Sequence, residues 1–90
     1  MEIDKAVLLF KMMSNPIRLG ILKELSENGV LCVSKLEEAI GSSQSSTSQH
    51  LAHLRNSGIL TCQKNGKKVC YTIADKDVEQ LIKGLELEEN

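Results

Sequence analysis

Aromatic side chains are almost absent from this 90-residue chain, which has Phe10, Tyr71 and no tryptophan. The core must therefore consist of Leu, Ile, Val, Ala and Met, a composition that favours helices packed on helices. Proline is also scarce, and Pro16 is the only one. Because a chain of this length buries one modest core, we expect a single domain over residues 1–90.

Long apolar runs are missing as well. No stretch reaches 18 apolar residues, which excludes a membrane-spanning helix, and MEIDKAVLLFKMM lacks the basic and apolar blocks of a signal peptide. The three cysteines are an odd number in a chain without a secretory signal. This usage indicates a reducing cytosol rather than a disulfide scaffold. We expect a cytoplasmic protein that does not interact with membranes.

Acidic side chains are missing from the 36 residues between Ala39 and Ala74. This run carries Arg55 and three lysines, a charge of +4, in a chain whose net charge is −1. The other residues hold all twelve acids against seven bases, which gives −5. A basic surface without carboxylates is expected where a protein meets phosphate groups. The alternative is a face that is merely solvated.

Apolar periodicity and turn residues divide the chain into five helices and three strands. Asn15 and Pro16 begin the second helix, and Ser34 with Glu37 forms a capping box for the third. The third and fourth helices are separated by three or four residues around Gly41, as in a helix-turn-helix. Their order predicts a winged helix-turn-helix, mainly α with a small β-hairpin. Helices are expected at 3–13, 16–28 and 34–40, from a cap at Ser42 or Ser43 to about Ser57, and from Asp75 or Lys76 to about Leu87. An edge strand is expected at 30–32, and a hairpin of 59–63 and 67–73 around Asn65-Gly66.

The fourth helix has an unusual composition for a solvated helix. Thr47, Leu51 and Leu54 form its inward stripe, and the opposite face is neutral and rich in hydrogen-bonding groups instead of Glu and Lys. We expect this face to enter the major groove of double-stranded DNA and to read base edges. For His50, a partly buried ring with satisfied hydrogen bonds is an equal alternative. The residues assigned to this role are Gln44, Ser45, Ser46, Ser48, Gln49, His50 and His53.

The predicted hairpin serves as the wing, along the DNA backbone or the minor groove. Its cationic side chains contact phosphates and fix position without reading sequence. About three to four phosphates are neutralised per subunit, so DNA binding should depend strongly on salt. A winged helix that binds only protein is the alternative. The residues assigned to backbone and wing contacts are Arg55, Lys64, Asn65, Lys67 and Lys68.

The last helix carries an apolar stripe whose only evident partner in so small a core is the first helix or another subunit. An isolated chain of this size is marginally stable, and burying its terminal helices against a second copy is a common remedy. We therefore expect a homodimer paired through these two helices. The residues assigned to the interface are Ile3, Val7, Phe10, Val78, Leu81, Ile82 and Leu85.

Two segments carry a family resemblance. SNPIRLGILKEL and SSQSSTSQHLAHLRNSGIL, followed by the hairpin and YTI, resemble the NPxRLxIL helix and the QSxxSxHLxxLRxxGLV segment of the ArsR family of bacterial winged-helix repressors. The resemblance covers nearly the whole chain. It implies a homodimeric transcriptional repressor that binds an imperfect palindrome and releases it when an inducer or a chemical change reaches it. It also places Gln44, Ser45, Ser48, Gln49 and His50 at recognition-helix positions.

Metal-binding and catalytic patterns are incomplete. Metal-responsive members that this chain resembles carry ELCVCDL, where VLCVSKL here has Cys32 for the first thiolate and Ser34 for the second. A hydroxyl does not replace a thiolate on a soft ion, and the last helix lacks the histidine of the family's other site. Nucleophile elbows and phosphate-binding glycine loops are also absent. We expect no metal, no cofactor and no enzymatic activity.

The cysteines leave one alternative open. Cys32 is expected to be a small buried apolar residue. Cys62 and Cys70 lie on opposite strands of the hairpin, and the turn register decides whether they meet. A redox-responsive repressor that switches through Cys32, Cys62 or Cys70 is therefore the second hypothesis.

Overall fold

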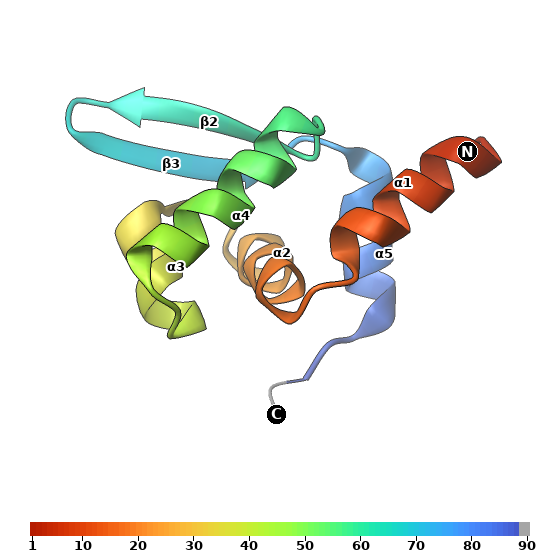
Figure 1. The fold of residues 1–90 in the computed structure, drawn as a ribbon, viewed down its shortest axis with the longest axis horizontal. Helices are drawn as coiled ribbons and strands as arrows, with labels where there is room; N and C mark the ends of the chain where they lie inside the picture. The colour runs from red at the N-terminus through yellow and green to blue at the C-terminus, as the bar shows by residue number, and fades with distance from the viewer. Residues whose placement is uncertain (89–90) are drawn as a thin grey trace.

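The computed structural model describes residues 1–88 as five helices and one antiparallel sheet (Figure 1). The order of the elements is that of the expected winged helix-turn-helix. No helix in this described part is long and apolar enough to cross a membrane. The elements are α1 (Ile3–Met13), α2 (Pro16–Asn28), β1 (Val30–Cys32), α3 (Val33–Ile40), α4 (Gln44–Asn56), β2 (Leu60–Asn65), β3 (Lys68–Ile73) and α5 (Lys76–Leu85).

Side-chain caps begin two of the helices as their sequences predict. The Asn15 side-chain oxygen accepts hydrogen bonds from the backbone N–H groups of Ile17 and Arg18 at 2.9 and 3.1 Å, and so caps α2. At α4, the Ser43 hydroxyl accepts from the backbone N–H of Ser46 at 3.2 Å. These bonds satisfy donors that have no partner within the helix.

The start of α3 differs from the prediction. The helix begins at Val33, directly after β1, and Cys32 occupies the N-cap position without a side-chain cap hydrogen bond. Ser34 is therefore inside the helix, and the expected capping box with Glu37 was wrong. The physical reason is that Cys32 is held in the sheet opposite Cys70, so the chain turns from strand into helix without a linker.

The sheet has the strand order β1-β3-β2, with β1 at an edge as expected. Asn65 pairs with Lys68, so the two loop residues of the hairpin are Gly66 and Lys67. The prediction placed the turn at Asn65-Gly66, one residue too early. Gly66 has a φ of +62°, a conformation that glycine adopts without steric cost. The pairing of β1 with β3 ends at Cys32 and Cys70. From there toward its loop, the hairpin of β2 and β3 is a two-stranded ribbon that projects from the body (Figure 1).

One apolar core joins the helices to the base of the sheet. In α1, Leu9 and Met13 point into this core, whereas Ile3, Val7 and Phe10 are exposed. The apolar residues of α1 therefore lie on two faces of the helix, with Leu9 and Met13 on the inner one. The buried apolar residues are Leu9, Met13, Ile21, Leu22, Leu25, Leu36, Leu51, Leu54, Ile59, Leu60, Tyr71, Val78 and Ile82.

The last helix contributes more to this core than its stripe suggested. Val78 and Ile82 are only 0% and 4% exposed within the single chain, so they have almost no surface left for a second copy. Their assignment to a dimer interface is corrected to a place in the core. Leu81 is half-buried and Leu85 remains 54% exposed.

Candidate nucleic-acid interface

The helix α4 is anchored by the inward stripe that its sequence predicts. Thr47, Leu51 and Leu54 are each 0% exposed and pack into the core. Their spacing at i, i+4 and i+7 fixes the rotation of the helix, so that the opposite side faces solvent. Of the residues assigned to DNA reading, five are exposed: Gln44, Ser45, Ser48, Gln49 and His53.

The other two assigned residues of α4, Ser46 and His50, are half-buried. His50 lies toward α2, where the Arg18 Nε–H donates a hydrogen bond to its Nδ1 at 3.1 Å. Burial, followed by the positive charge of Arg18, lowers the pKa of His50 below its ordinary 6.5. The ring is therefore neutral near pH 7, with one nitrogen already occupied by a protein partner. Of the two alternatives for His50, the structure has the partly buried ring with a satisfied nitrogen.

Arg18 is a residue that the sequence analysis missed. It belongs to the NPIRL segment, but nothing in the local periodicity of α2 links it to a residue 32 positions later. Its hydrogen bond joins the scaffold helix α2 to α4. Arg18 therefore helps to set the orientation of the exposed α4 face.

The wing carries its three lysines on different sides of the ribbon. Because side chains alternate along a strand, Lys64 shares a face with its pairing partner Val69, and Lys68 shares the other face with Asn65. Lys67 lies in the loop at the tip. All four of these polar residues are exposed. The ribbon therefore presents positive charge at its tip and on both faces.

The basic residues of the acid-free run have no acidic partner among residues 1–88. In the described residues 1–88, Arg55, Lys64, Lys67 and Lys68 form no ion pair. Outside the run, four of the seven basic residues pair with carboxylates over 3.0 to 3.9 Å, whereas Lys11, Arg18 and Lys76 form no ion pair within residues 1–88. Those pairs are Lys5 with Asp75 and Asp77, Lys23 with Glu27, Lys35 with Glu38, and Lys83 with Glu79. The four unpaired cations are left available to an external anion.

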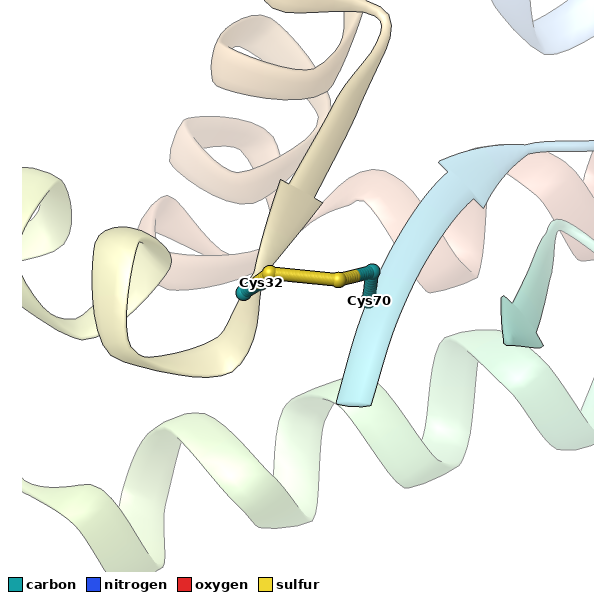
Figure 2. The surroundings of a disulfide bond; sticks show 2 residues. All are labelled: Cys32 and Cys70. Carbon is teal, nitrogen blue, oxygen red and sulfur yellow. A yellow bond between two sulfur atoms is a disulfide. The ribbon is translucent and has the colours of Figure 1, made fainter. Parts of the chain in front are cut away.

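The cysteines depart from the prediction. Cys32 and Cys70 form a disulfide between β1 and β3, so Cys32 is a half-buried bridge residue and not a small buried apolar residue (Figure 2). Cys62 is free and pairs with Tyr71 in the hairpin register. Because Gln63 is the residue opposite Cys70, the register does not bring Cys62 and Cys70 together. Among residues 1–88, no group of three His, Cys, Asp or Glu side chains is arranged to hold a metal ion.

Comparison with known proteins gives a consistent set of relatives. The family described as bacterial regulatory protein, arsR family, matches residues 15–61. An uncharacterised HTH-type transcriptional regulator of Methanocaldococcus jannaschii is 40% identical over 80 residues, 89% of this chain and 90% of that protein. The arsenical resistance operon repressor of Escherichia coli K12 is 48% identical over 66 residues, 73% of this chain. The matched region is 56% of that repressor, little more than half of its length.

A solved structure extends the likeness to the fold. Reduced HlyU from Vibrio cholerae N16961 matches with a TM-score of 0.87 and 41% identity, over 91% of this chain and 85% of that one. HlyU is named a transcriptional activator, whereas the Escherichia coli relative is named a repressor. These relatives are regulators of transcription by name and not enzymes. Likeness alone therefore does not give the sign of regulation.

Proposed function

Because this chain belongs to the ArsR family of bacterial regulatory proteins, we propose that it is a homodimeric transcriptional repressor that binds an imperfect palindrome in double-stranded DNA. The observation that carries the proposal is that the chain has two exposed surfaces suited to DNA. One is the exposed neutral face of α4, and the other is the set of unpaired cations at Arg55 and on the wing. No carboxylate interrupts the sequence that forms them.

In this proposal the two surfaces have separate roles. The first turns of α4 enter the major groove, where the amides of Gln44 and Gln49 and the hydroxyls of Ser45 and Ser48 meet base edges. The wing lysines contact phosphates and set the register of the protein on the duplex. Occupation of a promoter by such a dimer blocks transcription, which is the basis for proposing repression.

The dimer is supported by apolar surface on the terminal helices. Ile3, Val7, Leu8 and Phe10 of α1 are between 45% and 80% exposed, and Leu85 of α5 is 54% exposed. Ile3, Val7 and Phe10 share one face of α1 by their helical spacing, and an exposed apolar face of this kind marks protein contacts. Lys5 of α1 also pairs with Asp75 and Asp77, which fastens α1 to the start of α5, far from the wing tip (Figure 1). A protein that acts on the chromosome works in the cytoplasm.

Binding to duplex DNA as a function of salt tests the proposal. With about three to four phosphates neutralised per subunit, a dimer should show a slope of log affinity against log salt of about −5 to −7. Fluorescence anisotropy with labelled duplexes and sedimentation of the free protein measure affinity and assembly. A strictly monomeric protein, absence of binding at low salt, or affinity independent of salt would overturn it. Absence of binding would favour a winged helix that binds only protein.

A further inference from the structure

We infer that Cys32 and Cys70 form a reversible thiol-oxidation site, taking a peroxide as oxidant, whose disulfide clamps the wing to the helix-turn-helix. The inference rests on the proposed function, because it concerns the control of the same DNA-binding surface. In the oxidised form the disulfide holds the wing in the position that binds DNA. In the reduced form the wing is no longer fastened to the helix-turn-helix.

The position of the pair in the sheet carries the inference. The strand β1 has three residues, which pair Val30 with Thr72, Leu31 with Tyr71 and Cys32 with Cys70. The disulfide between β1 and β3 (Figure 2) therefore closes the last pair before the hairpin continues as a ribbon of β2 and β3 alone. An edge strand of three residues has few ladder hydrogen bonds to hold that end, and without the bridge it is free to fray.

The same bond reaches the helix-turn-helix directly. Cys32 is the N-cap residue of α3, so no linker separates the sulfur bridge from the first helix of the motif. Cys70 is two residues from Lys68 on the wing. One covalent bond therefore joins the two segments that position the α4 face and the wing lysines. Such preorganisation lowers the ordering cost of binding.

The third cysteine is separated from this site by the sheet itself. Cys62 pairs with Tyr71, whose side chain is buried in the core, whereas Cys70 lies on the opposite face of β3. Cys62 could therefore reach the disulfide only if β2 rotated or changed its register against β3. Cys32 and Cys70 are half-buried, which leaves them accessible to small reagents. A disulfide in a cytosolic protein is characteristically transient and redox-sensing, which agrees with a reversible clamp.

The chemistry balances with one equivalent of hydrogen peroxide. The thiolate of one cysteine attacks a peroxide oxygen and expels hydroxide, which takes up a proton, and a sulfenic acid is formed. The thiolate of the other cysteine attacks the sulfenic sulfur, and the oxygen leaves as a second water. Two thiols and one peroxide thus give a disulfide and two waters. A dithiol reverses the step through a mixed disulfide and is itself oxidised.

The test compares the affinity of oxidised and reduced protein for DNA. The full chain, its Cys62→Ser variant and its Cys32→Ser/Cys70→Ser variant are each treated with hydrogen peroxide or with dithiothreitol. Each sample is titrated against a labelled mixed-sequence duplex of about 30 base pairs at low salt. The wild-type chain and the Cys62→Ser variant should bind about five- to tenfold more weakly when reduced, with a smaller salt slope. The doubly substituted variant should bind at the weaker level after both treatments.

Three results would overturn the clamp: equal affinity of oxidised and reduced wild-type protein, a response that persists without Cys32 and Cys70, or a response that disappears with Cys62. The first needs no substitution, so a misfolded variant does not obscure it. A wild-type chain that binds duplex in neither state would instead overturn the proposed function, and the clamp with it. Equal binding in both states overturns the clamp alone.

Discussion

Arg18 of α2 donates its Nε–H to Nδ1 of His50 on α4 over 3.1 Å, which joins the scaffold helix to the helix that faces outward. Both residues lie in the two segments that carry the family resemblance. The bond needs a neutral imidazole, because Nδ1 accepts a hydrogen bond only when it carries no proton. The link between these helices is therefore sensitive to acid.

We expect stability to decline as the pH falls below the ordinary His50 pKa of 6.5. The pKa is lower in the folded chain than in the unfolded one, so the unfolded state binds more protons in this window. The contribution is fully present above 6.5, and it is lost as the pH falls through the folded pKa. The loss for one proton cannot exceed about 1.4 kcal/mol per pH unit. Urea unfolding between neutral and mildly acid pH, at fixed protein concentration, measures it.

Two asparagine variants provide controls for this prediction. His50→Asn keeps an oxygen acceptor for Arg18 but cannot titrate, so its stability should be flatter across the same window. His53→Asn changes an exposed histidine of the same helix and removes only the smallest of the three influences that lower the His50 pKa, so it should retain most of the wild-type pH dependence. If the His53 variant were the flat one, the acid sensitivity would not belong to the Arg18–His50 bond.

Local patterns predicted much of the fold and of the α4 face. The spacing of Thr47, Leu51 and Leu54 fixed which side of α4 is buried, because helical periodicity is a local property. The hairpin was also predicted, but its loop was displaced by one residue. In the observed loop only the first residue, Gly66, has a positive φ. A turn with Asn65 and Gly66 as its two loop residues would have required a positive φ at both of them.

Contacts between distant segments were not predictable in the same way. The Cys32–Cys70 bridge depends on the pairing of β1 with β3, which joins residues 38 positions apart. An apolar stripe also predicts that a helix face is buried, but not whether the same chain or a second copy buries it. Val78 and Ile82 are covered by the chain's own core, while Phe10 of the first helix is left exposed. Both outcomes follow from tertiary packing and not from periodicity.

Separate roles for the wing and α4 predict different effects of two alanine substitutions. Lys67→Ala should weaken binding to all duplexes similarly and reduce the salt slope by about 1 for each phosphate that the protein no longer neutralises. Gln49→Ala should instead reduce the discrimination between specific and random duplexes. Anisotropy titrations with both duplex types separate the effects. Lys83→Ala, in the ion pair with Glu79 on α5, is the control that should change neither. Equal effects of Lys67→Ala and Gln49→Ala on random DNA would contradict the division of roles.

Removal of apolar surface from α1 should yield a folded monomer. Phe10 is 59% exposed and contributes little to the core of its own chain, so Phe10→Ser should weaken self-association while the helical circular dichroism is retained. Analytical ultracentrifugation over a concentration series measures the change. Val30→Ser is the matched control, since Val30 is 56% exposed but lies on β1. A monomer produced by Val30→Ser and not by Phe10→Ser would place the interface elsewhere.

The start of α5 offers a test of what fastens the terminal helices. The Asp75 carboxylate accepts from the backbone N–H groups of Asp77 and Val78 at 2.8 and 3.2 Å and also pairs with Lys5. Burial alone would raise the pKa of Asp75, but these hydrogen bonds and the Lys5 ammonium outweigh it and hold the pKa below its ordinary value. The carboxylate is therefore charged at neutral pH and serves as cap and ion-pair partner together.

Substitutions at Asp75 separate these two roles. Asp75→Ala removes the cap and should lower the free energy of unfolding by about 1 kcal/mol, whereas Asp75→Asn keeps a capping oxygen and should lose less than half of that. Urea unfolding at neutral pH and fixed protein concentration measures both values, since dimerisation would add to the stability. Asp77→Asn is the control, because it removes a Lys5 partner without removing the cap. If Asp75→Asn and Asp77→Asn were as costly as Asp75→Ala, the ion pair with Lys5, and not the cap, would hold α5 in place.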